Sequence, residues 1–177
     1  MGSLGPTPPA SSAAVLARFR QQGRRDTAHE LAVRRALHRS GVRYRVDVTV
    51  IPGSRVRPDI VWRGRRIAVF LDGCFWHACP DHQHWPKANA AWWRTKIEGN
   101  VVRDRRADAL LLSQGWTVRR YWEHEDPAAV VTSIRTALAA ADRSTKRAVS
   151  WPTGSGRTAA RGAPGPAALR GTAAAGA

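Results

Sequence analysis

The chain has 177 residues, enough for one domain with tails, and lysine plus arginine outnumber aspartate plus glutamate 29 to 13. This excess favours a polyanionic partner, nucleic acid before an anionic membrane surface. The sequence has no apolar run of about 18 residues, no recognisable signal peptide and only two cysteines, which argues against a membrane-spanning or disulfide-rich secreted protein and favours the cytoplasm.

Composition divides the chain into three parts. Residues 1–24 are rich in Pro, Ser, Ala and Gly and then basic, so we expect a flexible arm, either a plain extension or a segment that contacts DNA. Residues 25–141 hold the folded domain. Residues 142–177 contain mostly Ala, Gly, Pro, Thr and Arg, which cannot bury enough apolar surface to fold, so we expect a disordered tail.

The folded domain is expected to begin with a helix between Asp26 and Gly41. Thr27 and Glu30 have the spacing of a capping box, and Gly41 is typical of a helix end. Glu30 is either part of this cap or a carboxylate directed at the sheet, and its spacing favours the cap. The apolar residues available for burial are Ala28, Leu31, Ala36 and Leu37.

Three strands are expected next. Residues 42–50 alternate apolar and polar side chains, which predicts a strand with one apolar face. Residues 58–62 form a second candidate, and the apolar run over 67–72 is a third, buried strand. A helix followed by these strands predicts a mixed or antiparallel sheet with helices packed on it.

A long helix is expected over 90–114. Asn89 can cap its start and Gly115 can end it. The pair Gly99-Asn100 in its middle can kink it.

The domain is expected to end with a fourth strand and a last helix. The strand covers 116–122. Asp126 and Pro127 are a cap and a first helical position, and the helix runs to about Ala141. Its core face carries Val130, Val131, Ile134 and Leu138.

Asp59 and Asp72 stand at the ends of two neighbouring predicted strands. If these strands pair through the short connection 63–65, the two carboxylates come together and offer the hard oxygen ligands that Mg²⁺ prefers. Such a cation neutralises charge at a phosphodiester and helps to activate water. Pro-Asp at the start of one strand, followed by a second motif that begins with Asp72, resembles a known nuclease pattern. In that pattern a lysine ends the second motif, whereas Cys74 stands at that position here. The alternative is that both aspartates only cap strands and turns.

A possible zinc site follows the third predicted strand. Cys74, Cys79 and His82 supply three zinc-type ligands within nine residues, and either His84 or His124 can supply the fourth. A ligand from His124 would join two distant segments, as structural zinc commonly does. The alternative is a pair of buried free thiols.

His77 lies between Asp72 and Cys79. If a metal folds this loop, the imidazole is held beside the strand ends and can take a proton from water. Asp104 on the long helix can orient that imidazole.

Three aromatic side chains accompany this loop: Phe75, Trp76 and Trp93. Each can pack in the core, or the group can wedge between base pairs and kink a duplex.

Together, these residues resemble the very-short-patch repair endonuclease family (Vsr), which nicks DNA at T:G mismatches. The matching segments lie in order between about residues 26 and 126, and the run Gly-Cys-Phe-Trp-His at 73–77 is the most distinctive. They are Glu30 and the segments 41–45, 52–53, 58–61, 69–77, 85–87, 93–97, 100–104 and 115–124.

This resemblance implies a restriction-endonuclease-like α/β fold of the PD-(D/E)xK type, with a structural zinc site in place of the usual catalytic lysine. It implies that Asp59 and the Leu71 carbonyl bind Mg²⁺ and that His77 is the general base. Asp104 and Glu30 would organise water near the metal, or the imidazole. Asp72 replaces a histidine of the best-known family form, and is either a second metal carboxylate or a substitute for that histidine's contact to water.

The resemblance further implies a zinc set and a DNA-binding set of residues. The zinc ligands would be Cys74, Cys79, His124 and His82, the last favoured over His84. The DNA-binding residues would be the wedge Phe75, Trp76 and Trp93, together with Lys96 and Asn100.

The expected function is Mg²⁺-dependent nicking of one DNA strand on the 5′ side of the thymine in a T:G mismatch, which arises when 5-methylcytosine deaminates. We expect a monomer that acts on double-stranded DNA at the nucleoid without membrane contact, and the sequence does not identify a mismatch-repair partner. The alternatives are a restriction-like nuclease without mismatch preference and a non-catalytic, zinc-stabilised DNA-binding protein.

Overall fold

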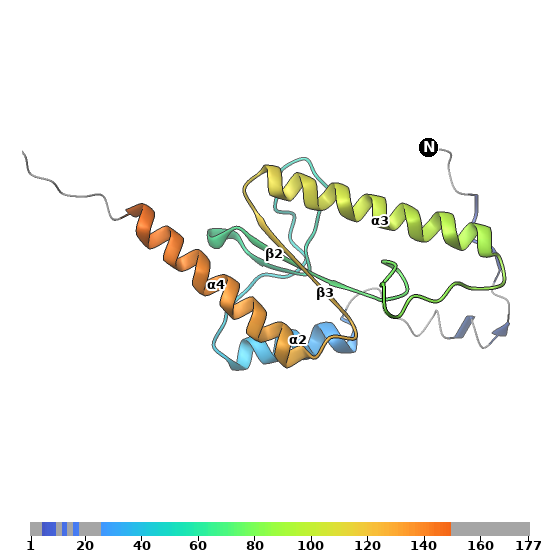
Figure 1. The fold of residues 1–177 in the computed structure, drawn as a ribbon, viewed down its shortest axis with the longest axis horizontal. Coiled ribbons are helices and arrows are strands. Elements are labelled where there is room, and N and C mark those ends of the chain that lie inside the picture. Colours follow the sequence, from blue (N-terminus) through green and yellow to red (C-terminus); the bar gives the residue numbers. More distant parts are fainter. Residues whose placement is uncertain (1–4, 10–11, 14–15, 18–25, 150–177) are drawn as a thin grey trace, which may run out of the picture.

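The computed structural model describes residues 5–9, 12–13, 16–17 and 26–149. Within this part of the chain, helices and strands alternate around a small sheet (Figure 1). The elements are α2 (Ala28–Arg39), β1 (Ile60–Trp62), the 3₁₀ turn η1 (Arg63–Arg65), β2 (Ile67–Asp72), α3 (Ala90–Ser113), β3 (Thr117–Trp122) and α4 (Pro127–Val149).

The sheet is mixed, which is one of the two arrangements that the order of elements predicts. Its strand order is β1-β2-β3, with β1 antiparallel and β3 parallel to the central strand β2. The register pairs Ile60 with Val69, and Asp72 with Trp122. β1 is antiparallel to β2 and β3 is parallel to it. The start of β1 and the ends of β2 and β3 therefore lie at the same end of the sheet, the edge at which these strand termini meet.

Helices cover both faces of this sheet. In Figure 1, α2 and α4 lie together below the strands and α3 lies above them. The core on the α2 and α4 side includes alternate residues of β2, namely Ile67, Val69 and Leu71. Phe70 instead contacts the guanidinium of Arg120, which also binds Asp108 on α3. The predicted core face of α4 is confirmed, since Val130, Val131, Ile134 and Leu138 are all buried.

Two of the three predicted helix caps are confirmed, at Thr27 and Asp126, and the third, at Asn89, does not form. Thr27 accepts a hydrogen bond from the Glu30 N–H, and the Asp126 carboxylate accepts from the N–H groups of the residues after Pro127. Asn89 does precede α3, but it has a φ of 57° and its side chain makes no capping bond. The helix therefore begins where predicted without the predicted interaction.

The predicted strand over 42–50 is wrong. This segment makes only an isolated bridge, in which Arg45 and Val61 exchange backbone hydrogen bonds of 3.0 and 2.8 Å. Asp47 has a φ of 48°, in the left-handed region, which ends the strand alternation. Tyr44 still packs against the core, edge-on to the Trp62 ring, whereas Val46 is 40% exposed.

Smaller differences between prediction and structure concern α2 and α4. Ala28 is exposed instead of buried, and Val33 takes a fully buried position on α2 beside Leu37. The last helix continues past Ala141 to Val149. Most of the predicted arm 1–24, and the predicted tail from residue 150 onward, lie outside the described residues.

No helix in the described part of the chain combines the length and the apolar character needed to cross a membrane.

The packing of α4 on the core predicts a large loss of stability for Ile134→Ala. Ile134 is fully buried in the core cluster, so truncation should leave a cavity and lower the free energy of unfolding by about 2–5 kcal/mol. Urea unfolding followed by circular dichroism measures this. The exposed neighbour Arg135→Ala is the matched control, and equal losses in both variants would contradict the packing.

Candidate active site and metal centre

The antiparallel pairing of β1 with β2 brings Asp59 to the end of β2. The Leu71 N–H donates a hydrogen bond of 2.7 Å to Asp59 Oδ2, and Asp72 is the next residue along the strand. The structure therefore brings together the two strand ends that the sequence predicted to converge.

The Asp59 carboxyl lies in an environment that suits a cation. Burial raises its pKa to about 6, against the opposing effect of the Leu71 N–H, and the negative charges of Glu30 and Asp72 raise it further. A buried carboxylate near two other acids is costly without a compensating positive charge. Its oxygens and the adjacent strand-end carbonyls are the ligand type that Mg²⁺ takes, so the residues present fit such an ion.

Glu30 takes the helix-cap position that its spacing favoured. Its carboxylate accepts hydrogen bonds from the Asp26 N–H at 3.1 Å and the Thr27 hydroxyl at 3.2 Å, and it pairs with Arg34 at 2.6 Å. The residue is only 7% exposed. Glu30 acts on Asp59 through its charge, while its own oxygens are occupied by α2 and its cap.

Asp72 is bound by an arginine that the sequence analysis did not identify. Arg120 Nη1 lies 2.8 and 2.7 Å from the two Asp72 oxygens, and Arg120 Nε lies 3.1 and 3.0 Å from those of Asp108 on α3. Its guanidinium also stacks over the Phe70 ring, 4.3 Å from the centroid. Burial raises the pKa of Asp72, while the charges of His77 and Arg120 act in the opposite direction.

His77 lies beside Asp104 on α3. His77 Nδ1 lies 2.7 Å from Asp104 Oδ2 and 3.6 Å from Asp72 Oδ1. Burial acts to lower the pKa of His77, but the hydrogen bond to Asp104 and the charges of both acids outweigh it and raise the pKa. Because a carboxylate only accepts, Nδ1 is the donor and Nε2 is the nitrogen left for other partners.

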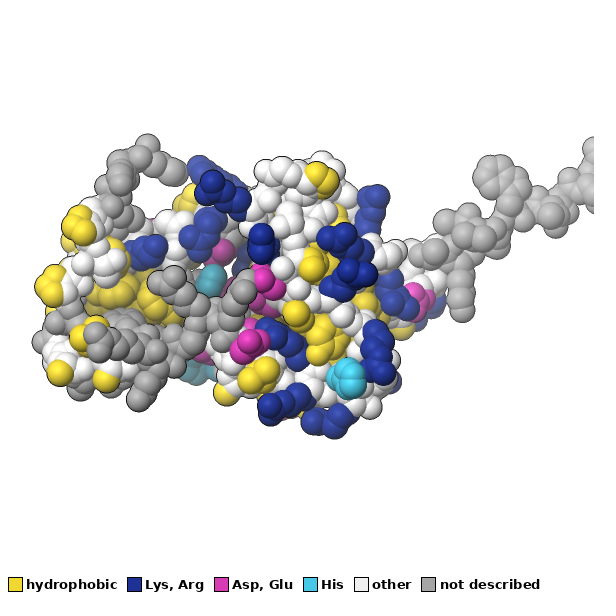
Figure 2. All heavy atoms as spheres, turned by 180° about the vertical axis from the view of Figure 1, so that it is seen from behind, with side chains coloured by type: hydrophobic (Ala, Val, Ile, Leu, Met, Phe, Trp, Pro, Cys, Tyr) yellow, Lys and Arg dark blue, Asp and Glu magenta, His cyan; other side chains and the backbone are white. Residues whose placement is uncertain are grey.

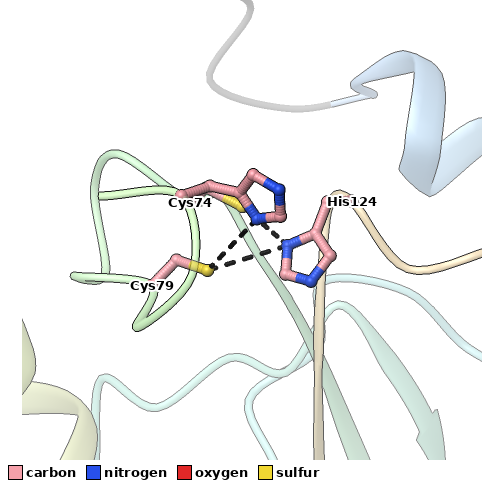
Figure 3. A group of neighbouring side chains, drawn as sticks. Cys74, Cys79 and His124 are labelled. Atoms are coloured by element: carbon pink, nitrogen blue, oxygen red, sulfur yellow. Dashed lines mark hydrogen bonds between the residues drawn. The ribbon is translucent and has the colours of Figure 1, made fainter. Parts of the chain in front are cut away.

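A cluster of four metal-type ligands lies beside this pair. Donor atoms of Cys74, Cys79, His82 and His124 all lie within 4.8 Å of one another. Figure 3 shows the labelled Cys74, Cys79 and His124 side chains pointing toward one another. The His124 Nδ1 lies 3.1 Å from Cys74 Sγ and 3.7 Å from Cys79 Sγ. These separations are close to the roughly 3.3–3.8 Å between donors around a tetrahedral zinc ion.

The fold explains why these four residues meet. His124 follows β3 and Cys74 follows β2, and parallel neighbouring strands place both ends at one sheet edge. The Glu123 carboxylate also accepts the Cys74 N–H at 2.8 Å, and the Cys79 N–H donates to the Cys74 carbonyl at 3.0 Å. Burial raises the pKa of the Cys74 thiol to about 12, and a bound cation would stabilise the thiolate instead.

The aromatic residues form a separate half-buried cluster at the loop. The Phe75 ring centroid lies 5.0 Å from that of Trp76 and 5.4 Å from that of Trp93, and none of the three belongs to the core cluster. His84 packs against Phe75, outside the metal cluster. Asn100 is 6% exposed and donates to the Trp76 carbonyl at 3.0 Å, so it supports the cluster from α3.

Basic side chains are numerous on the surface of the molecule. Figure 2 shows lysine and arginine side chains over much of one face, with a group of acidic side chains near its middle. Lys96 lies one turn from Trp93 on α3. A duplex phosphate backbone would find charge complementarity on such a face.

The sequence analysis missed Arg120, Asp108, Glu123 and Arg34. A signal existed for Arg120, since two adjacent arginines in a short strand must point to opposite faces. Finding its partners also required the β2–β3 register, which the sequence did not provide.

The chain is similar to known proteins over much of its length. The family model described as DNA mismatch endonuclease Vsr matches residues 9–86. The chain is 44% identical over 131 residues to the type II nicking enzyme V.NaeI of Lentzea aerocolonigenes, covering 72% of this chain and 79% of that protein.

Two further relatives show the same relationship. The type II nicking enzyme V.XorIIP of Xanthomonas oryzae is 40% identical, with 64% of this chain and 84% of that protein covered. The DNA mismatch endonuclease Vsr of Escherichia coli K12 is 38% identical over 104 residues, or 56% of this chain and 62% of that protein.

The cluster geometry predicts different outcomes for two neighbouring histidines. His82→Ala should lose the metal, because the His82 ring nitrogen is one of the four clustered donors, whereas His84→Ala should keep one ion per chain. Elemental analysis of the purified variants measures this. Loss of metal from His84→Ala with retention in His82→Ala would contradict the cluster. Metal loss should also lower the free energy of unfolding by several kcal/mol.

Proposed function

The chain belongs to the Vsr family and is a DNA endonuclease that nicks DNA, and on this premise we propose that it cuts one strand on the 5′ side of the thymine in a T:G mismatch. The main support is the juxtaposition of the Asp59–Leu71 strand ends with the His77–Asp104 pair at one edge of the sheet. A carboxylate for a metal and an oriented imidazole are what phosphodiester hydrolysis requires.

We assign two different metals to the two sites. Asp59 and the Leu71 carbonyl would hold Mg²⁺, which supplies charge neutralisation at the phosphate and helps to activate water. The Cys74, Cys79, His82 and His124 set would hold a structural Zn²⁺, since two thiolates and two imidazoles are a donor set typical of that ion. Zinc would fix the loop that carries His77.

His77 acts as the general base in this proposal. Its Nδ1 is engaged by Asp104, so Nε2 takes the proton from the attacking water. The Asp104 carboxylate then stabilises the imidazolium that forms. Glu30 contributes through its charge on Asp59, and Asp72 contributes through Arg120 instead of as a second metal ligand, because both of its oxygens are bound by that guanidinium.

The aromatic cluster would supply the contact to the mismatch. Phe75, Trp76 and Trp93 are partly exposed beside the basic residues, and such side chains can enter between base pairs and unstack them. Lys96 would bind the backbone, and Asn100 would hold the Trp76 loop in place.

The remaining assignments rest on the family. We propose that the mixed sheet flanked by helices is a restriction-endonuclease-like core of the PD-(D/E)xK type and that residues 25–141 form the catalytic domain. The protein would act as a monomer on double-stranded DNA in the cytoplasm.

A duplex panel tests the specificity. With Mg²⁺ present, a T:G duplex labelled separately on each strand should be nicked only on the thymine strand, while the T:A and C:G duplexes of the same sequence remain intact. Flanking bases should be randomised, because the structure does not fix them. Equal cutting of matched duplexes would replace the proposal with a nuclease lacking mismatch preference. Binding without a product under any condition would replace it with a non-catalytic DNA-binding protein.

Asp59→Asn should abolish nicking while leaving DNA binding intact. The substitution keeps the side-chain size but removes the charge that holds the cation, and we expect a rate loss of about 10²–10³-fold or more. Gel-based nicking rates and fluorescence anisotropy measure the two properties. Asp142→Asn, on α4 beside Arg65 at the opposite end of the sheet, is the matched control.

His77→Gln should lower the single-turnover rate by about 10²–10⁴-fold with little change in DNA affinity, because an amide cannot take the proton. His38→Gln, at the exposed end of α2, is the matched control and should retain the wild-type rate. A His77→Gln enzyme with the wild-type rate would remove His77 from its proposed role.

A further inference from the structure

Two carboxylates, a buried one and a half-buried one, lie close to the same nitrogen at this site. His77 Nδ1 lies 2.7 Å from Asp104 and 3.6 Å from Asp72, and the Asp72 side chain is the more buried of the two acids. An imidazole donates only one hydrogen bond from Nδ1, so the choice of acceptor sets the orientation of the ring. Other contacts in the fold must therefore determine which of these two acids accepts the hydrogen bond from His77 Nδ1.

The contacts of Arg120 can determine which acid accepts this hydrogen bond. Its Nη1 binds both Asp72 oxygens, its Nε binds both Asp108 oxygens, and Nη2 lies 4.0 Å from Asp104 Oδ1. The guanidinium thus connects β2, α3 and its own strand β3. Because its N–H groups form a rigid planar fork, these contacts fix the directions in which the acids point.

We propose that Arg120 is a positioning residue for the general base: by occupying Asp72, it leaves Asp104 as the acceptor for His77 Nδ1 and keeps Nε2 directed at the DNA. Arg120 need not contact the substrate to do this. The inference rests on the proposed role of His77 in strand nicking.

The role of Arg120 follows from the energetic cost of an unpaired buried charge. Without Arg120, the Asp72 carboxylate would remain almost fully buried with no compensating donor, which is strongly unfavourable. The nearest group able to satisfy it is the His77 imidazole, 3.6 Å away. The ring would move toward Asp72, and displacement of a catalytic group by about 1 Å can cost roughly 10²-fold in rate.

The first test is kinetic and uses four variants of the full chain. Arg120→Met should lower kcat for nicking by about 10–100-fold without changing KM for the duplex. Arg119→Met removes the same charge from the neighbouring exposed position of β3 and should behave as wild type. Arg120→Lys keeps the charge without the fork and should recover part of the rate. The double variant Arg120→Met/Asp72→Asn removes the unpaired carboxylate and should exceed Arg120→Met alone.

Three kinetic results would overturn the proposal: wild-type kcat in Arg120→Met, an equal loss in Arg119→Met, or no recovery in both the lysine and the double variant. If Arg120→Met fails to fold, as shown by loss of bound metal, the comparison of Arg120→Lys and the double variant with Arg119→Met decides in its place.

The second test needs no substrate. The ring nitrogens of His77, assigned through His77→Gln, should shift in the long-range ¹H–¹⁵N NMR spectrum of Arg120→Met and remain unchanged in Arg119→Met. An unchanged His77 signal in Arg120→Met would overturn the proposal. If the wild type nicks no mismatched duplex, the proposed function fails, while this spectrum still decides whether Arg120 positions the ring.

Discussion

The whole site depends on the hydrogen-bonded pairing of β2 with its two neighbours. The antiparallel ladder with β1 sets Asp59 against Leu71, and the parallel ladder with β3 sets Trp122 against Asp72. Every group with a proposed chemical role lies on the residues that follow or precede these pairs, or on α2 and α3, which cover the two faces. A shift of register by one residue would reverse which side chains face α3 and separate Arg120 from Asp72.

The proposed catalytic and metal sites share one short loop, and this sharing explains its composition. Residues 73–83 turn back between Cys74 and Cys79, so that one segment contributes two sulfur donors, the proposed base and part of the aromatic cluster. Loops are in general more mobile than the elements they connect. Anchors at Glu123, His124 and Asn100 supply the order from other elements.

Much of this arrangement could be predicted from local sequence, and the rest could not. The buried run of β2, the caps at Thr27 and Asp126 and the spacing of Cys74, Cys79 and His82 all depend on near neighbours in the chain. The strand expected over 42–50 failed because its alternation says nothing of the backbone at Asp47. The role of Arg120 stayed hidden because its partners lie 12 and 48 positions away, on elements whose register only the folded chain reveals.

The bridge at Arg45 has a consequence for the protein in a crowded cell. An open strand edge invites pairing with another chain, and β1 would be such an edge were the segment before it elsewhere. The segment around Arg45 forms a single pair of backbone hydrogen bonds with Val61, so it covers part of the β1 edge without forming a strand of the sheet. At the opposite side, β3 presents Arg119 and Thr117 to solvent, and like charges on two copies would repel. Both margins of the sheet therefore carry features that oppose pairing with a second copy of the chain.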